Sequence, residues 1–333
     1  MDPLTQIRLS RELIDIDSTT GREAEAGRWI AATLSSLGYE VAEQPVAPGR
    51  CNLFARVGHP AVVLSTHYDC VPPFFPSREA GGRLHGRGSC DAKGTLLAQI
   101  AAVERLRAAG EDRVGLLFVV GEERGSDGAR AANAIAPGSA FLVNGEPTDN
   151  RLALATRGVY RVRLTATGRA AHSSRPELGE SAIEKLVDAL VAVRSIAWPE
   201  DPDLGRTFYV ASLINGGVAP NVVPASAEAE LMFRTVGGPE PVRRALEARV
   251  GSLVAVDDVL HVPPVRLKTL PGFETATFSF TTDIPFLDRW GEPLLLGPGS
   301  VTEAHTADES VGIDELHRAV DRYERIARAL LAG

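Results

Sequence analysis

Histidine and acidic residues follow three short apolar runs of the chain, at the point where each run ends. The runs end in His-Tyr-Asp, Gly-Glu-Glu and Gly-Glu-Pro sequences, which contribute His67, Asp69, Glu122, Glu123 and Glu146. If the runs are parallel strands of an open α/β sheet, their carboxyl ends meet at one edge, where such sheets bind ligands. We therefore expect the side chains of His67, Glu122, Glu123 and Glu146 to converge there.

Carboxylates crowded at one sheet edge would repel one another and shift their pKa values unless a multivalent cation neutralises them. Two more residues extend the group: Asp91 in the glycine-rich segment 86–94, and His305 in a loop ahead of the last predicted helix. Histidine nitrogen together with carboxylate oxygen suits zinc better than calcium or magnesium. The sequence thus indicates a divalent-metal site.

Other interpretations of nearby residues carry less weight. The segment 86–94 lacks the Gly-Lys-Ser/Thr ending of a P-loop and the spacing of a dinucleotide-binding fingerprint, so nucleotide binding is the weaker alternative. Cys70 and Cys90 adjoin expected metal residues, but buried small thiols are common, so we interpret both as structural. Asp283 could be a cap, a turn residue or a group behind the site, and the sequence does not choose among these roles.

The elements that must hold these residues follow a layered α/β pattern. Short apolar runs alternate with helical periodicity up to about residue 157, and the pattern returns near the C-terminus. Buried strands are predicted at residues 61–65, 114–120, 140–143 and 294–296, and helices at residues 4–16, 23–37, 95–108 and 313–331. The chemistry-bearing residues then lie in the loops that follow the strands.

A second pattern occupies the middle of the chain. Strand, helix, strand, strand, helix and strand follow one another, which is the βαββαβ order of a ferredoxin-like domain. These elements are predicted at residues 160–167, 180–196, 207–214, 225–235, 240–250 and 252–262. We therefore predict a catalytic metal-binding domain, residues 1–156 and 264–333, and an inserted domain, residues 157–263, joined by two crossings that could act as a hinge.

Seven short sequences make the chain resemble the zinc-dependent aminoacylases and carboxypeptidases. That family includes acetylornithine deacetylase, succinyl-diaminopimelate desuccinylase and the glutamate-releasing carboxypeptidase. The sequences, all in family order, are His67-Tyr-Asp-Cys-Val-Pro, Gly86-Arg-Gly-Ser-Cys-Asp-Ala-Lys-Gly, Gly121-Glu-Glu, Gly145-Glu-Pro-Thr, Ala171-His-Ser, Asn221-Val-Val-Pro and Ala304-His-Thr. The resemblance spans nearly the whole chain and implies a layered α/β zinc-peptidase domain, with the ferredoxin-like domain as lid and dimerisation domain.

The resemblance also implies a metal ligand set. His67 and Glu146 would bind one zinc ion, Glu123 and His305 would bind another, and Asp91 would bridge the two ions. Cobalt or manganese in place of zinc stays open.

Glu122 is the general base that the resemblance implies, and Asp69 is the carboxylate that orients the imidazole of His67. Two metal ions lower the pKa of a water between them toward neutrality, and Glu122 can take its proton as the metal-bound hydroxide attacks the acyl carbon. Glu122 could then pass the proton to the departing amine. Such a site hydrolyses an amide bond without a covalent intermediate.

Three residues of the inserted domain have roles that only the resemblance implies. Arg234 would anchor a substrate carboxylate, since a planar guanidinium can bind both oxygens, although an outward-facing arginine on a strand is commonly just exposed. Asn221 and His172 would touch substrate from the lid, and His172 would stabilise the oxyanion from its own chain or across a dimer interface. A hydrogen-bonded structural histidine is the alternative for His172.

The expected activity is hydrolysis of the amide bond of an N-acyl amino acid, as in acetylornithine deacetylase. A metallo-dipeptidase or carboxypeptidase, or succinyl-diaminopimelate desuccinylase, would use the same catalytic residues, so these activities stay open. A protein that binds metal or ligand without catalysis is less favoured, because every catalytic position is filled.

The composition of the chain argues against several classes of binding partner and cellular location. A formal net charge of −8 over 333 residues argues against nucleic acid or an anionic membrane as the main partner. The N-terminus lacks the apolar stretch of a signal peptide, no run approaches a membrane span, and three cysteines argue against a disulfide framework. We therefore expect a cytoplasmic homodimer, joined through the inserted domain, that acts on a small N-acyl amino acid or a short peptide.

Overall fold

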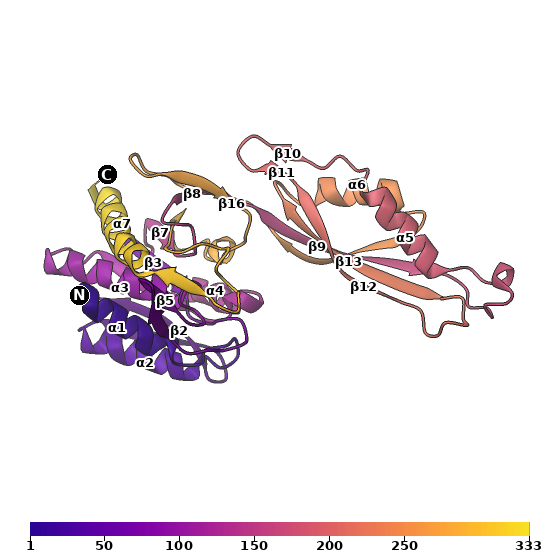
Figure 1. Cartoon of the computed structure of the whole chain (residues 1–333). Coiled ribbons are helices and arrows are strands. Elements are labelled where there is room, and N and C mark those ends of the chain that lie inside the picture. The colour runs from indigo at the N-terminus through magenta and orange to yellow at the C-terminus, as the bar shows by residue number, and fades with distance from the viewer. Residues whose placement is uncertain (333) are drawn as a thin grey trace. The chain divides into compact units, whose positions relative to one another are not determined.

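The computed structural model describes residues 1–332, which form two compact units. The first unit holds Met1–Leu154, Leu267–Ala276 and the chain from Thr282 onward, and the second holds Ala155–Arg266 and Thr277–Thr281. Figure 1 shows both chain ends, indigo and yellow, in the first unit. The boundaries expected from the sequence were residues 157 and 263, and residues 277–281 were expected in the catalytic domain. This short segment packs with the second unit instead, where the Phe278 carbonyl oxygen accepts the Arg157 amide.

A six-stranded sheet forms the centre of the first unit. Its order is β1 (Glu40–Ala47), β2 (Arg50–Arg56), β6 (Val114–Val119), β3 (Val62–His67), β7 (Phe141–Asn144) and β17 (Glu292–Leu295). The last four strands are parallel to one another, and β2 runs antiparallel to both of its neighbours, β1 and β6. Every residue of β3 and β6 is buried, as expected for parallel strands covered on both faces. The four buried strands predicted for this part of the chain are confirmed.

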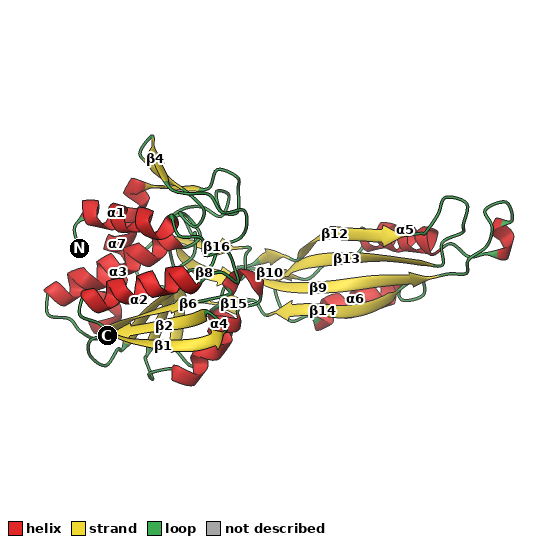
Figure 2. Cartoon of the chain, turned by 90° about the horizontal axis from the view of Figure 1, so that it is seen from below, coloured by secondary structure: helices red, strands yellow, loops and turns green. Residues whose placement is uncertain are grey.

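Helices cover both faces of this sheet. They are α1 (Pro3–Ile14), α2 (Ala24–Ser36), α3 (Lys93–Ala108), α4 (Asp127–Ala132) and α7 (Ile313–Ala332). Val62 and Leu64 pack in one core with α2, α3 and α7, whereas Val63 packs in another with α4 and Trp290. Figure 2 shows α1, α2, α3 and α7 grouped together. No helix among residues 1–332 combines the length and the apolar composition of a bilayer span.

Short strands that the sequence did not predict complete the first unit. β4 (Arg78–Ala80), β5 (Arg83–His85) and β18 (Ser310–Gly312) form an antiparallel sheet of order β18-β5-β4. Runs of three residues are too short to show a hydrophobic period. Because β5 leads into the loop that ends at Asp91, and the segment after His305 leads into β18, this small sheet sets those two segments side by side.

A further sheet contains the segments where the chain crosses between the units. Its strands are β15 (Val265–Arg266), β8 (Leu152–Thr156) and β16 (Thr275–Phe278), in that order.

The second unit has the predicted ferredoxin-like βαββαβ order. Its elements are β9 (Gly158–Thr167), α5 (Ala182–Val193), β12 (Phe208–Gly216), β13 (Ser226–Thr235), α6 (Glu240–Val250) and β14 (Ala255–Val262), with a small hairpin of β10 (Glu200–Asp201) and β11 (Gly205–Arg206) before β12. The antiparallel sheet has the order β12-β13-β9-β14 and carries its own core against α5 and α6. The strand predicted at residues 252–262 begins later, because α6 continues to Val250 and a turn follows it.

Candidate metal centre

Three parallel strands bring four of the predicted residues to one edge of the sheet. β3 ends at His67, β6 is followed by the 3₁₀ turn η1 (Glu122–Arg124), and Glu146 comes two residues after β7. Because β3 lies between β6 and β7, the carboxyl ends of these strands are neighbours. Gly121 makes the turn into η1: its φ of +76° suits glycine, and a Cβ there would lie 1.8 Å from Asp127 Oδ1.

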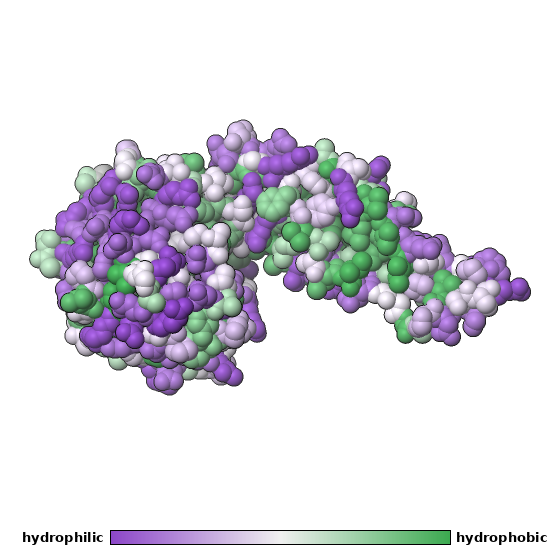
Figure 3. Space-filling view, in the orientation of Figure 1, coloured by the Kyte–Doolittle hydropathy of each residue, from purple (hydrophilic) through white to green (hydrophobic). Residues whose placement is uncertain are grey.

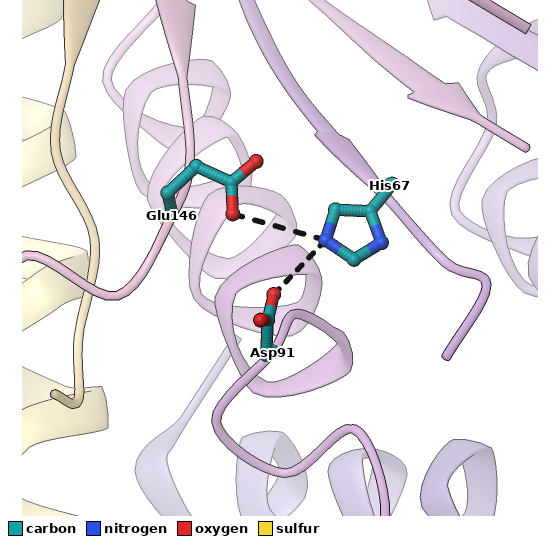
Figure 4. A group of neighbouring side chains, drawn as sticks. All are labelled: His67, Asp91 and Glu146. Carbon is teal, nitrogen blue, oxygen red and sulfur yellow. Dashed lines mark hydrogen bonds and ion pairs between the residues drawn. The ribbon is translucent and has the colours of Figure 1, made fainter. Parts of the chain in front are cut away.

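The first group of metal-binding side chains consists of His67, Asp91 and Glu146, which point toward one another in Figure 4. Nε2 of His67 lies 3.0 Å from Asp91 Oδ1 and 3.8 Å from Glu146 Oε2. His67 and Glu146 are buried, and Oε1 of Glu146 has no hydrogen-bond partner among the described residues. A buried carboxylate oxygen without a partner is costly, so this atom favours a bound cation.

The second group consists of Asp91, Glu123 and His305. Nε2 of His305 lies 2.9 Å from Glu123 Oε1 and 3.3 Å from Asp91 Oδ2. His305 adopts a φ of +62°, a left-handed conformation that a non-glycine residue rarely takes. Asp91 therefore belongs to both groups, with Oδ1 facing His67 and Oδ2 facing His305.

The charges of these residues perturb one another strongly. Burial raises the pKa of Glu146 to about 8 and also raises the pKa of Glu123. Hydrogen bonds to Asp91 and Glu123 raise the pKa of His305 to about 10. Burial lowers the pKa of His67, but its bonds to carboxylates outweigh burial and hold the pKa well above its ordinary value. Without a cation, the site thus balances its negative charge with protons on imidazole and carboxyl groups.

Two divalent cations fit this arrangement. Each group offers one imidazole nitrogen and two carboxylates, a nitrogen and oxygen set that zinc accepts. Asp91 can contribute one oxygen to each cation, because its two oxygens face different groups. Because these ligands bind metal in their deprotonated form, a cation in each group would release protons from the imidazole and carboxyl groups.

Asp69 contacts the backbone that carries the two adjacent glutamates. Its carboxylate accepts the amide of Glu122 at 3.1 Å, the amide of Glu123 at 3.3 Å and the Thr20 hydroxyl at 2.8 Å. Nδ1 of His67 lies 3.0 Å from the Asp69 backbone oxygen and 3.5 Å from its Oδ1. The imidazole is thus oriented first by the Asp69 carbonyl, while the carboxylate fixes η1. Glu122 belongs to neither metal group, and burial raises its pKa well above the ordinary value.

The other three predicted residues lie in the second unit, at two different ends of its sheet. His172 and Asn221 are exposed and adjacent, because the Ser173 amide donates to the Asn221 carbonyl oxygen just beyond the end of β9. Arg234 is half-buried on β13 and pairs with Val159 at the start of β9. Eight residues of β13 separate the two ends, which is roughly 25 Å of strand.

The Arg234 guanidinium makes no hydrogen bond or ion pair with any residue in the described part of the chain, and burial lowers its pKa. A half-buried cation without a partner is costly unless an anion pairs with it. This observation fits the predicted contact with a substrate carboxylate.

The structure also shows the surroundings of Asp283, Cys70 and Cys90, whose roles the sequence left open or assigned to the core. Asp283 is buried and makes no capping hydrogen bond to η4 (Ile284–Phe286), and burial raises its pKa to about 7. Cys70 and Cys90 are buried free thiols that belong to neither metal group.

Glu309 is not predicted from the sequence, although it is a fully buried carboxylate hydrogen-bonded to the loop that ends at Asp91. Its only sequence signal is its position four residues after His305, in an Asp-Glu-Ser stretch that is typical of a solvated loop.

Two joined groups of imidazole and carboxylate side chains at one sheet edge are the kind of site that a metal-dependent hydrolase uses. The chain belongs to peptidase family M20/M25/M40, whose sequence profile matches residues 63–329. The predicted resemblance to the zinc-dependent aminoacylases and carboxypeptidases is thereby confirmed. A probable carboxypeptidase of Aspergillus clavatus is 35% identical over 96% of this chain and 81% of its own length.

Solved structures share the fold over the whole chain. The aminopeptidase PepT of Bacillus cereus has a TM-score of 0.82 at 19% identity and covers 99% of both chains. The YXEP protein of Bacillus subtilis, described as a dinuclear metal-binding peptidase of the M20 family, has a TM-score of 0.75 at 15% identity, over 99% of this chain and 98% of its own. The predicted α/β fold with an inserted domain is confirmed.

Proposed function

We propose that the protein is a dinuclear metallopeptidase that cleaves the amide bond next to an amino acid with a free carboxylate. The observation that carries the proposal is the position of Asp91, whose two oxygens face two separate groups of metal-binding side chains. The relative named a probable carboxypeptidase favours a short peptide as substrate. Acetylornithine deacetylase-like cleavage of an N-acyl amino acid is the alternative within the same chemistry.

His67, Asp91 and Glu146 would hold one metal ion, and Glu123 and His305 with the other oxygen of Asp91 would hold the second. Zinc is the proposed metal, with cobalt or manganese as alternatives, because the ligands are imidazole nitrogens and carboxylate oxygens. When bound, two such ions polarise a carbonyl group and lower the pKa of water.

Glu122 is the proposed general base. It would take a proton from the attacking water and pass it to the departing amine, because it adjoins Glu123 in the chain, is influenced by the charges of Glu146 and His67, and belongs to neither metal group. Its raised pKa suits a group that must hold a proton between these two steps. Asp69 would keep Glu122 in place through the backbone amide of η1.

The second unit, residues 155–266 and 277–281, is proposed as a lid and dimerisation domain, and the first unit as the catalytic metal-binding domain. Arg234 would bind the substrate carboxylate, while Asn221 and His172 would contact the substrate at the reacting bond. Since roughly 25 Å of strand separates Arg234 from the other two, one small substrate cannot touch all three residues of a single second unit. We therefore propose that His172 and Asn221 come from a partner subunit.

An apolar surface on the second unit supports a homodimer. β12 is an edge strand, and its Val210, Leu213 and Ile214 are exposed together with Val187 and Val191 of the neighbouring α5. Figure 3 shows a hydrophobic area on this unit. An exposed apolar edge strand is a ready site for pairing with another chain.

A release assay tests the proposed function. Metal-loaded protein is offered dipeptides, N-acetyl amino acids and N-succinyl amino acids, each with a free and an amidated C-terminus, and the released amine is quantified. We expect release from short peptides with a free carboxylate and little release from their amides. No release from any substrate by protein that holds two metal ions would refute the activity, and equal rates on free and amidated substrates would remove Arg234 as the anchor.

A further inference from the structure

A buried glutamate outside both metal groups holds the loop that carries Asp91. Glu309 is fully buried and lies immediately before β18. Its Oε1 accepts three backbone N–H groups, from Gly88, Cys90 and Asp91, each at 3.0 Å. Amides that converge in this way form an anion-binding concavity. The anion here is a side chain of the same chain.

The other oxygen of Glu309 is paired with a buried guanidinium. Oε2 lies 2.6 Å from Nη1 of Arg87. The same side chain donates from Nε to the Pro73 carbonyl oxygen at 3.1 Å and from Nη2 to the Thr306 carbonyl oxygen at 3.0 Å. Both oxygens of Glu309 and all three nitrogens of Arg87 are therefore hydrogen-bonded, which is the condition under which a buried ion pair is tolerated.

This cluster joins two segments that are distant in sequence. Glu309 lies four residues after His305, and the amides that it binds belong to the loop ending at Asp91. The loop can wrap around the carboxylate because Gly88 has a φ of +88°, and a Cβ there would lie 2.7 Å from Cys70 Sγ. Asp91 and His305 then meet in the second metal group, with their nearest atoms 3.3 Å apart.

From this geometry we propose that Glu309 is a positioning residue that holds Asp91 and His305 in place relative to each other. Loss of its contacts would therefore weaken metal binding in both groups together. The inference rests on the proposed metal sites. Because Asp91 belongs to both groups, a displaced 88–91 loop would disturb the ligands of both ions. Changes in groups that hold metal ligands typically weaken metal binding by about 10-fold to 100-fold.

Glu309→Gln tests the proposal with metal binding as the readout. Glutamine has nearly the same size, but its NH₂ group must face either Arg87 or the three amides. In both cases two hydrogen-bond donors face each other, so contacts that Glu309 makes are lost. Metal-free protein is titrated with zinc against a chelating dye, well below its unfolding temperature, and with cobalt to follow the absorption spectrum. We expect both binding steps to weaken by about 10-fold to 100-fold while the circular dichroism spectrum stays that of the wild type.

Glu303→Gln is the matched control. Glu303 lies in the same loop region and is partly exposed, and its carboxylate contacts Arg83 at 3.6 Å and the Ser310 hydroxyl at 3.5 Å instead of the amides of residues 88–91. Its zinc affinity should equal that of the wild type. Wild-type affinity in folded Glu309→Gln, or weakening of only one binding step, overturns the proposal. Wild-type protein that binds fewer than two ions overturns the proposed function instead.

If Glu309→Gln does not fold, Arg87→Lys tests whether the Glu309–Arg87 pair positions the metal ligands. Lysine keeps a positive charge opposite Glu309, but its single ammonium group cannot reproduce the three contacts of the guanidinium. We expect a smaller, measurable weakening of both binding steps, and wild-type affinity in this variant overturns the proposal.

Discussion

Each acidic residue of the centre is distinguished by what its oxygens touch. Asp91 offers one oxygen to each group, Asp69 holds backbone amides, and Glu122 belongs to neither group. The sequence could predict that these residues converge, because all follow buried strands or a glycine-rich loop. It could not predict that Asp69 holds η1, because that contact is made with backbone amides more than 50 residues away.

Glu122→Gln should leave metal binding intact and lower kcat by about 100-fold to 10,000-fold, because only the proton-transfer group is removed. Metal content is measured by elemental analysis, and kcat on the best substrate of the release assay. The exposed Glu79→Gln on β4 serves as the control and should match the wild type. Retained turnover in Glu122→Gln would show that another group takes the proton.

Metal-free protein should lose stability as pH rises through neutrality. Glu146, with its pKa raised from 4.5 to about 8, stabilises the fold at low pH and loses that contribution as pH rises from 4.5 to 8. His305, with its pKa raised from 6.5 to about 10, stabilises below pH 6.5 and loses that contribution as pH rises to 10. Both effects have the same sign between pH 6.5 and 8. We therefore expect the Tm of chelator-treated protein to fall across this window.

Added metal should remove much of this fall, because a bound cation holds the carboxylates in their charged form. Glu146→Gln, which has no carboxyl to titrate, should give a shallower fall in the metal-free state. The measurement is a thermal unfolding series from pH 6 to 9 with and without zinc. A metal-free Tm that rises with pH would show that protons do not stabilise the empty site.

Long helices and strands could be predicted from the sequence, whereas very short strands and the order of strands in a sheet could not. Long periodic segments such as α7 and the strands of the second unit were found, whereas β4, β5 and β18 have three residues each and carry no period. The pairing of β5 with β18 sets up the contacts of Glu309, so this residue was missed together with the strands. The strand pattern of β12 also did not reveal that it lies at a sheet edge, since that follows from the pairing of β13 with β9.

Leu213→Lys should separate the proposed dimer, because it places a charge in the exposed apolar surface of β12 and α5. Leu260→Lys is the matched control, since Leu260 is also exposed but lies on β14, the opposite edge of the same sheet. Light scattering after size exclusion measures the mass of each variant. We expect Leu213→Lys alone to be monomeric, with much reduced kcat but normal metal content. A dimeric and active Leu213→Lys protein would exclude this surface as the interface.

At the scale of the whole molecule, the proposed active site draws on two chains. Within one second unit, roughly 25 Å of β13 separates Arg234 from His172 and Asn221, so a small substrate bound to Arg234 needs a second chain to supply the other two. Two inactive variants should then complement each other. In a mixed dimer of His172→Ala and Glu122→Gln chains, one site has both substitutions and the other has neither.

Random exchange between equal amounts of these variants would make half of the dimers mixed, each with one intact site, so about a quarter of all sites should regain activity. The exchange is followed with differently tagged chains, and activity is measured on the best substrate. Mixing Glu122→Gln with Asp91→Ala is the control, because both residues belong to the first unit of one chain and no site regains both. Complete exchange without recovery in the first mixture would place His172 in the site of its own chain, and recovery in the control would show that activity arises from something other than shared sites.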